Sequence, residues 1–228
     1  MMPHTSAQIS LQGPSAVLMS TTGGDCKIGP EKRRGTGRAF PTNFTPIIVY
    51  HYTHRAFSRQ SNLWTTYQAG PQAAWAVVHG PGLNGKPALV GSGRLENEGL
   101  FGDPNIQTSN RAELRAVIAA LRLRRWSGEG FRTIVIATDS EFVTVGCTEW
   151  AKNWINNGWR TAGNSEVKNK DLWEMLLGEV ERWQDAGLSV KFWRIPRDWN
   201  KVADAAAKKA AKECEAQEQW MEMMGLAF

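Results

Sequence analysis

Cysteine is scarce in this sequence, and long apolar runs are absent. The three cysteines, Cys26, Cys147 and Cys214, are far apart, odd in number and in no metal-binding spacing. They argue against a disulfide framework and for a reducing compartment, so we expect an intracellular protein of the cytoplasm or nucleus. No run approaches the roughly 18 apolar residues of a membrane-spanning helix, so no such helix is expected.

A secretory signal is not expected either. The first 25 residues have neither a continuous apolar core nor a basic segment in front of one. A mitochondrial presequence is poor in acids and rich in arginine. These residues contain no acid before Asp25, but no arginine occurs before Arg33, so a location in the mitochondrion is the less favoured alternative.

Acidic residues are unevenly distributed. None occurs between Thr42 and Leu95, and residues 1–59 hold seven Lys or Arg against only Asp25 and Glu31. The remaining 169 residues balance 20 basic against 20 acidic side chains. A uniformly basic nucleic-acid-binding domain is therefore not expected.

Three segments are expected along the chain. Residues 1–45 are rich in Gly, Pro, Ser and Thr and contain the basic cluster Lys32-Arg33-Arg34, which predicts a disordered basic tail. That cluster is either a solvated charge run or an anchor for nucleic acid or nuclear import. Residues 46–212 are expected to form one domain, and residues 213–228 a C-terminal helix extension or tail.

Hydrophobic periodicity predicts an α/β fold with a mixed sheet. Strands are expected at Pro46–Tyr50, Ala73–Val78, Ala88–Leu95, Thr133–Thr138 and Leu188–Ile195. Helices are expected around the stripe Leu114, Val117, Ile118 and Leu121, from Ser140, over Asn169–Ala186 and after Trp199. The order βββ-α-β-α-α-β-α implies a five-stranded mixed sheet with helices on both faces.

Three carboxylates lie at the junctions of these elements. Glu113 is near the start of a helix, Asp139 ends a buried strand, and Asp204 is near the start of the last helix. Carboxylates brought from separate elements to one end of a sheet suit a hard divalent cation. Each acid also has a structural explanation. Glu113 can be a favourable charge at a helix start, Asp139 a cap of the helix from Ser140, and Asp204 an ion-pair partner of Lys208.

Several short motifs occur in a fixed order. They are Thr108–Leu114, Ala137–Ser140, Gly146 with Trp150–Trp159, Val167–Asn169 with Asp171–Trp173, and Asn200–Asp204. With these motifs the chain resembles the type 1 ribonuclease H family over about residues 46–212, and Phe192–Asn200 looks most like the fungal branch. The resemblance implies a ribonuclease H-like fold and metal-dependent cleavage of the RNA strand of RNA–DNA hybrids.

The resemblance also implies roles for individual residues. Glu113, Asp139 and Asp204 take three of the four catalytic positions that bind two Mg²⁺ ions, with Mn²⁺ as the alternative ion. The residues implied to contact the hybrid are Asn110, Trp150, Lys152, Trp154, Lys168, Asn169 and Asn200. The stretch Trp150–Lys170 matches the family's basic substrate handle. The alternative is that Trp150 and Trp154 mainly form the core of that handle.

Three positions depart from the family pattern. The fourth ligand is an Asp in a Tyr-Thr-Asp-Gly setting, and the best match puts His54 at the ligand and Arg55 at the glycine. Because Mg²⁺ prefers anionic oxygen to imidazole, we expect a weakened metal site and a gain from His54→Asp. Arg194 stands where the family has a mobile His, and Arg cannot shuttle protons at neutral pH. Either the nuclease is degenerate or residues 51–70 reflect a misread exon boundary.

The expected function is that of an RNA–DNA hybrid endoribonuclease with an impaired two-metal site. The alternative is a non-catalytic hybrid-binding pseudoenzyme, and a third hypothesis is a protein-interaction scaffold. The expected partner is nucleic acid and not a membrane, and a monomer is expected.

Overall fold

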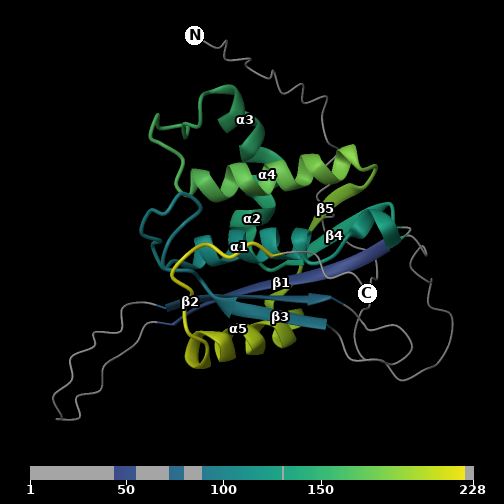
Figure 1. Cartoon of the computed structure of the whole chain (residues 1–228). Coiled ribbons are helices and arrows are strands. Elements are labelled where there is room, and N and C mark those ends of the chain that lie inside the picture. The colour runs from purple at the N-terminus through teal and green to yellow at the C-terminus, as the bar shows by residue number, and fades with distance from the viewer. Residues whose placement is uncertain (1–43, 55–71, 80–88, 130, 224–228) are drawn as a thin grey trace, which may run out of the picture.

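The fold is described by a computed structural model that places residues 44–54, 72–79, 89–129 and 131–223 (Figure 1). The predicted basic tail as far as residue 43, together with Arg55, lies outside these described residues. Among the helices in these ranges, none combines the length and apolar character needed to cross a membrane.

Within the described residues, five strands form one mixed sheet. They are β1 (Phe44–His54), β2 (Gln72–His79), β3 (Leu89–Arg94), β4 (Thr133–Thr138) and β5 (Ser189–Arg194). The spatial order is β3-β2-β1-β4-β5, with β1 antiparallel to β2 and parallel to β4. The predicted antiparallel arrangement of the first three strands is confirmed, and β4 has the predicted bounds.

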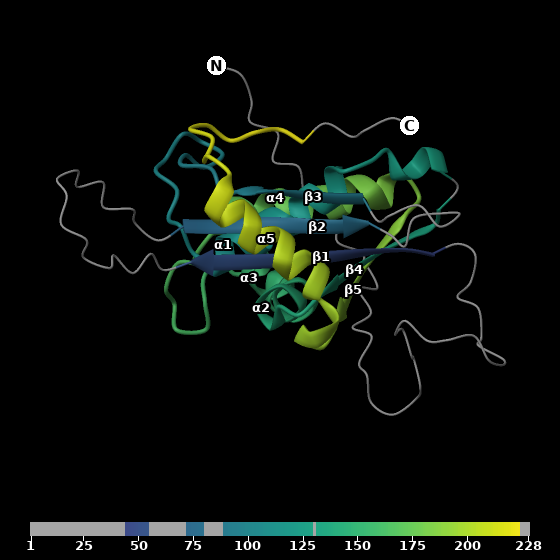
Figure 2. The ribbon, with the colours of Figure 1, turned by 90° about the horizontal axis from the view of Figure 1, so that it is seen from below.

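Helices cover both faces of the sheet, as predicted. They are α1 (Ser109–Arg122), α2 (Glu141–Val145), α3 (Ala151–Asn156), α4 (Lys170–Asp185) and α5 (Lys201–Glu213). Helix α1 packs on β1 and β2 with α4 against it, and α5 crosses the opposite face (Figures 1 and 2). A π-helical turn, Gly146–Trp150, joins α2 to α3.

The apolar stripe of α1 forms the centre of the main core. Leu114, Val117, Ile118 and Leu121 are completely buried, as the spacing predicts. Thr108 caps this helix, because its side chain accepts a hydrogen bond from the backbone N–H of Arg111. The cap and the stripe together fix the direction in which the first turn of α1 presents its polar side chains.

Helix α5 approaches the sheet through small side chains. Ala203 and Ala207 pack on Ala76 and Val78 of β2, while Ala210 and Ala211 form a second small cluster with Ala74. Because alanine fills little space, the backbone of α5 lies close to the strands. The start of α5 is thereby held at the end of the sheet where β4 and β5 finish.

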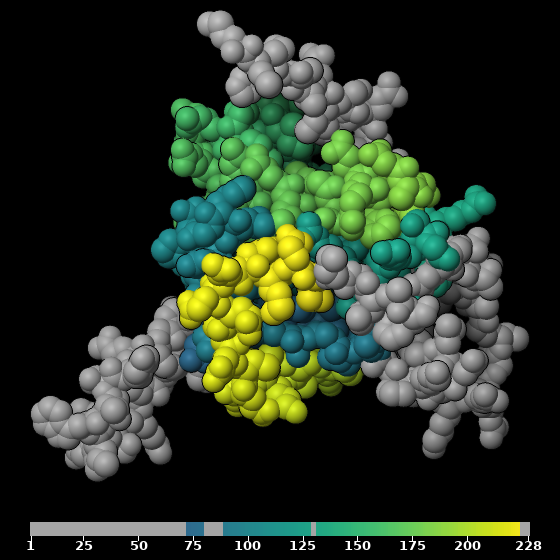
Figure 3. Space-filling model, viewed as in Figure 1, coloured from purple at the N-terminus to yellow at the C-terminus, as the bar shows by residue number. Residues whose placement is uncertain are grey.

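After α5 the chain runs back across the molecule as a non-helical segment, residues 214–223, which we call the C-terminal strap (Figure 3, yellow). Backbone N–H groups of Asn97 and Glu98 donate to the carbonyls of Gln217 and Glu218 over 2.9 and 2.8 Å. The Met221 carbonyl accepts a 2.9 Å hydrogen bond from Arg115. The described fold therefore continues past residue 212, where the domain was predicted to end.

The strap covers a buried ion pair. Arg115 and Glu96 are 1% and 2% exposed, and their closest nitrogen and oxygen are 2.7 Å apart. The Arg115 guanidinium lies between the rings of Trp75 and Trp220, at 4.9 and 4.3 Å from their centroids. Trp220 belongs to the strap, so this segment completes the surroundings of the charge.

His79, at the end of β2, predicts a pH dependence of stability. Burial, and then the nearby charge of Arg124, lower its pKa below 6.5 in the folded state. Below about pH 6.5 the unfolded chain binds the proton more readily, so stability falls until the folded pKa is reached. Above about pH 6.5 the contribution of neutral His79 to stability is fully present. Between neutral and mildly acidic pH, the melting temperature of His79→Gln should therefore fall less than that of the unmodified chain. An equal fall in both proteins would contradict this prediction.

Candidate active site

Three acids from three elements are gathered at one end of the sheet. Glu113 lies in the first half of α1, Asp139 directly follows β4, and Asp204 lies in the first turn of α5. Helices α1 and α5 cover opposite faces of the sheet, and the hydrogen bond from Asn200 to Asp139 brings the start of α5 to the end of β4. Ser140, which follows Asp139 in the chain, is hydrogen-bonded to Glu113, and Asn200 is hydrogen-bonded to Asp139 and to the backbone of Asp204.

Ser140 connects Glu113 to the end of β4. Glu113 is only 7% exposed, and the Ser140 hydroxyl donates a short hydrogen bond to its Oε2. The same hydroxyl accepts from the backbone N–H of Val143 at 3.1 Å and so caps α2. One side chain therefore fixes both the Glu113 carboxylate and the start of α2.

Asn200 connects Asp139 to Asp204. Its Nδ2 donates to Asp139 Oδ1 at 2.9 Å, and its backbone carbonyl accepts the Asp204 N–H at 2.9 Å. Asn200 was predicted to contact substrate, yet it is 1% exposed. Its position favours holding the two acids in place over contacting a nucleic acid.

Lys208 places a positive charge on the third acid. Its Nζ lies 2.6 Å from Asp204 Oδ2, one helical turn along α5. The side chain of Asp204 is 23% exposed and that of Lys208 is 45% exposed. The ion pair suggested by the spacing is present, and it occupies an oxygen that was predicted to bind a cation.

The fit of this region to two metal ions is incomplete. In the described part of the chain, no three His, Cys, Asp or Glu side chains form a group that could hold a metal ion. One oxygen of each acid is engaged, by Ser140, Asn200 and Lys208 respectively. The described residues therefore gather the acids but do not build a two-ion site.

The register of β1 bears on the predicted fourth ligand. Val49 pairs with Thr138, so the next residue, Tyr50, is level with Asp139. His54 lies four residues further along and pairs with Gln72 of β2. At about 3.3 Å per residue, that places its backbone roughly 13 Å past the level of Asp139. The register thus favours position 50 over position 54, and neither position carries an acid.

Arg194 ends β5 beside the acids. It pairs with Thr138 in the sheet, and its guanidinium lies 2.7 Å from the Glu141 carboxylate at the start of α2. Both side chains are exposed. Arg194, predicted to replace a mobile His, is thus held at the edge of the region by an ion pair that solvent screens.

The predicted handle contains a chain of aromatic rings. Trp154 lies 5.8 Å from Trp150, 6.3 Å from Trp159 and 5.3 Å from Trp173, measured between ring centroids. Trp173 is completely buried, whereas Trp150 is exposed. A Cβ at Gly146 would lie 2.2 Å from the Trp173 ring, so only glycine fits there. Trp154 is partly buried and packs against the main core, which agrees with the alternative hypothesis for that residue, whereas Trp150 is exposed.

The predicted hybrid contacts of the handle lie on its surface. Lys152 and Lys168 are exposed, and Asn169 adopts a left-handed conformation with φ of 59° at the start of α4. Asn110 is half-buried in the first turn of α1. The two lysines can therefore reach a phosphate backbone, whereas Asn110 and Asn169 are partly enclosed.

An ion pair that was not predicted joins α1 to the first turn of α4, directly after the handle. The buried guanidinium of Arg111 donates to both carboxylate oxygens of Asp171, at 3.0 and 2.6 Å, and to Asn169 Oδ1 at 3.4 Å. Both Arg111 and Asp171 lie within the motifs noted in the sequence, but no spacing rule pairs residues 60 apart. This bidentate pair fixes the handle relative to Asn110 and Glu113.

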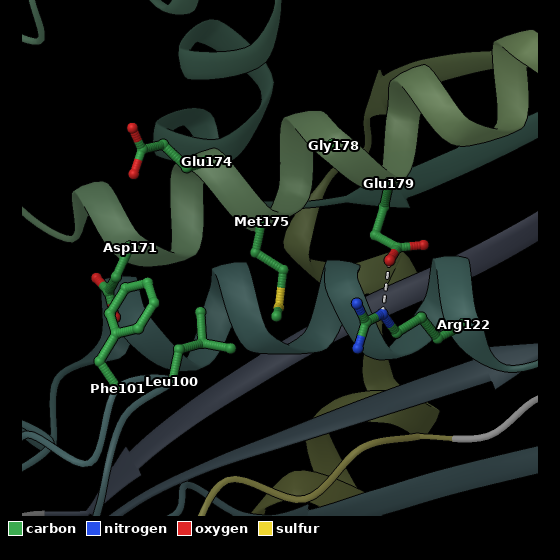
Figure 4. A pocket seen from close by; sticks show the side chains of 8 residues that line it. All are labelled: Leu100, Phe101, Arg122, Asp171, Glu174, Met175, Gly178 and Glu179. Carbon is green, nitrogen blue, oxygen red and sulfur yellow. Dashed lines mark hydrogen bonds and ion pairs between the residues drawn. The ribbon is translucent and has the colours of Figure 1, made fainter. Parts of the chain in front are cut away.

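A pocket elsewhere in the fold does not contain the acids. It has a volume of about 350 Å³ and lies between α4, α1 and the loop before α1 (Figure 4). Leu100 and Met175 line it, and Arg122 donates to Glu179 at 2.7 Å on its wall. Because Glu113, Asp139 and Asp204 are all absent from its lining, this pocket is separate from the candidate site.

Sequence comparisons with known proteins give the same family as the motifs. The profile of the family described as RNase H matches residues 80–212. Ribonuclease H of Hahella chejuensis is 44% identical over 138 residues, which cover 60% of this chain and 89% of that protein. Ribonuclease HI of Neisseria meningitidis serogroup A is 38% identical over 133 residues, covering 58% of this chain and 88% of that protein.

Solved structures show the same fold at low identity. The solution structure of the PFV RNase H domain is 15% identical with a TM-score of 0.54, covering 75% of this chain and 96% of that one. A foamy viral protease-reverse transcriptase in complex with RNA/DNA hybrid is 17% identical with a TM-score of 0.54, covering 84% of this chain and 24% of that one.

Proposed function

Because this chain belongs to the ribonuclease H family, we propose that it binds RNA–DNA hybrids and hydrolyses their RNA strand weakly. Glu113, Asp139 and Asp204 are the proposed catalytic and cation-binding residues, and the ion is Mg²⁺ or Mn²⁺. The 2′-hydroxyl of the RNA strand distinguishes the hybrid from DNA duplex. The special likeness of Phe192–Asn200 to the fungal branch remains a prediction.

The arrangement of the three acids carries this proposal. Glu113 on α1 and Asp139 after β4 are held by direct hydrogen bonds from Ser140 and Asn200. Packing alone does not require a buried Glu113 beside an acid at the end of a parallel strand, since a buried charge is costly. The presence of both acids, each with its own hydrogen-bond donor, supports a catalytic role.

The chain's own residues supply orientation and charge. A bound divalent cation would activate water and stabilise the leaving oxygen at the phosphodiester. Ser140 and Asn200 keep one oxygen of Glu113 and one of Asp139 fixed, so the other oxygen of each is presented in a defined direction. Lys152, Lys168 and the exposed face of Trp150 are proposed to hold the hybrid backbone.

Weak catalysis is proposed because the acids are too few. No Asp or Glu occurs between residues 42 and 95, so no shift of register along β1 can supply the missing ligand. Removing a partner that merely orients a metal ligand typically costs about 10–100-fold, and a missing ligand should cost more. The same observation favours the second candidate, a hybrid-binding protein without catalysis.

Hybrid binding is tested by gel shift with the whole chain in the absence of divalent ions. We expect micromolar or tighter binding of an RNA–DNA hybrid and weaker binding of DNA duplex. Lys152→Ala with Lys168→Ala should weaken binding and reduce its salt dependence, because each lost phosphate contact lowers the log–log slope by up to about 0.9.

Lys212→Ala is the matched control, since Lys212 is also exposed but lies at the far end of α5. It should bind the hybrid like the unmodified chain. Equal binding of hybrid and DNA duplex, or equal effects of the handle and control variants, would contradict the proposal and favour a scaffold.

A further inference from the structure

Two tryptophans with open ring surface lie beside the gathered acids. Trp193 is in the last turn of sequence of β5, and Trp199 ends a short helical turn, Arg197–Trp199, that leads from β5 to α5. We infer that these two rings, which we call the tryptophan patch, bind unpaired nucleotides of the RNA strand where that strand leaves the hybrid. The inference rests on the proposed function and narrows its substrate to a hybrid whose RNA continues as a single strand.

The first observation is that the patch keeps aromatic surface exposed. The ring centroids of Trp193 and Trp199 are 6.1 Å apart with 78° between the ring planes, an edge-to-face contact. Trp199 is nevertheless 42% exposed, and Trp193 is half-buried. Helix α5 packs on β1, β2 and β3, whereas β5 is the edge strand on the other side of the sheet. The described fold thus leaves ring surface open, and a base can stack on it.

The second observation is the charge around the rings. Residues 191–202 contain four basic side chains and one acid, Asp198, whereas residues 60–228 as a whole are balanced. Glu141 also lies here, 2.7 Å from the guanidinium of Arg194, and with it the surroundings still have a positive net charge. The four basic residues are Lys191, Arg194, Arg197 and Lys201. Cations around an exposed aromatic ring are the combination that binds single-stranded nucleic acid.

The third observation is that the patch and the handle lie on opposite sides of the sheet. Phe192 belongs to the main core, so Trp193, the next residue of the strand, faces the other side. The handle packs on the main-core side through Trp154. The acids also come from both sides, with Glu113 on α1 and Asp204 on α5. The handle and the patch therefore flank the acids.

The patch is also close to the acids. Trp199 directly precedes Asn200, whose Nδ2 lies 2.9 Å from Asp139 Oδ1. Trp193 pairs in the sheet with Ala137, two residues before Asp139. A strand that is held at the handle and cut at the acids would reach the patch as it continues. That strand is RNA, because RNA is the strand that the proposed reaction cleaves.

Unpaired nucleotides suit these rings better than the hybrid itself. Inside a duplex, both faces of each base are stacked on neighbouring bases, so no face is open to a tryptophan. Bases of a single strand are free to stack on aromatic side chains, while basic side chains neutralise their phosphates. A partner protein that covered the rings would also have to supply acids for the basic residues around them. The positive surplus therefore favours nucleic acid as the occupant.

The test measures binding of labelled duplexes to the whole chain by fluorescence anisotropy without divalent ions. The probes are a blunt RNA–DNA hybrid, the same hybrid with an unpaired RNA extension of about eight nucleotides at either end, and the same hybrid with that extension on the DNA strand. We expect the RNA extension at one end to tighten binding by about tenfold, the effect of stacking one base on an aromatic ring. The DNA extension should have a smaller effect.

Variants of the patch locate this gain. Trp199→Ala should remove it, whereas Trp199→Phe keeps an aromatic ring and should retain most of it. Phe101→Ala is the matched control, because Phe101 is 78% exposed but lines the pocket that is separate from the acids. This control should show the full gain.

A charge reversal keeps the inference falsifiable if Trp199→Ala alters folding. Lys201 is exposed at the start of α5, where a negative charge is compatible with the helix. Lys201→Glu should therefore fold normally and reduce the gain from the RNA extension several-fold. Lys212→Glu, at the far end of the same helix, makes the same change in charge and should reduce the gain less.

Four outcomes would overturn the inference. They are no gain from an RNA extension at either end, an equal gain from the DNA extension, a full gain in Trp199→Ala, or equal effects of the two lysine variants. Binding of the blunt hybrid is measured in the same experiment and does not depend on the patch. Its failure would refute the proposed function, whereas its success without the gain would refute this inference alone.

Discussion

Replacing Tyr50 by aspartate is expected to increase Mg²⁺-dependent cleavage of a hybrid by about 10–100-fold, the scale on which partners of metal ligands act. Tyr50 is level with Asp139 in the parallel β1–β4 pair. An acid there would stand level with Asp139 on the neighbouring strand and raise the number of acids at this end of the sheet. Labelled-hybrid cleavage and Mg²⁺-dependent melting of the same variant are the two measurements.

His54→Asp is the matched comparison, because it adds the same charge to the same strand. The motif match in the sequence predicts a gain there, whereas the strand register places position 54 roughly 13 Å past the level of Asp139. We therefore expect little change in cleavage or in Mg²⁺ affinity. A gain in His54→Asp without one in Tyr50→Asp would show that the motif, and not the register, locates the ligand.

Replacing Glu96 by alanine is expected to destabilise the fold by about 3–5 kcal/mol, the cost of leaving a buried charge unpaired. The charge is that of Arg115, which is 1% exposed and bonded to Glu96. Neither Trp75 nor Trp220 can replace a carboxylate as a hydrogen-bond acceptor. Urea unfolding at neutral pH measures the loss.

A double variant separates charge from packing. Glu96→Leu with Arg115→Met removes both partners, and replacing a whole buried pair by apolar side chains is often neutral or stabilising. We expect it to regain most of the stability lost in Glu96→Ala. A loss below about 1 kcal/mol in Glu96→Ala would mean that water reaches Arg115 and that the strap does not seal it.

Much of the central fold is predictable because its signals are local. The run Ile134–Ala137 is continuously apolar, as expected of a parallel strand covered on both faces, and the stripe of α1 has the helical period. The strap has no such signal. Its contacts include hydrogen bonds to the strap backbone and the Arg115–Trp220 stacking, which join residues more than 100 positions apart and leave no periodicity.

The gathering of the acids is likewise predictable, because each lies at a junction of two elements. The side chains that hold the acids in place are less predictable from the sequence. Asn200 and Ser140 act through atoms whose direction depends on the packed fold, and a short motif does not reveal it. Position 54 shows the same limit: a match of two residues, Tyr52 and Thr53, can slide along a strand, whereas pairing with β4 fixes the register.

Cleavage of one labelled RNA–DNA hybrid in Mg²⁺ and in Mn²⁺ tests the central claim most directly. The three-acid site predicts that the whole chain binds the hybrid but cleaves it at least about a hundredfold more slowly in Mg²⁺ than a ribonuclease H with all four acids. It also predicts faster cleavage in Mn²⁺, abolished by Glu113→Gln. Full turnover in Mg²⁺, or Mn²⁺-dependent cleavage that survives Glu113→Gln, would contradict it.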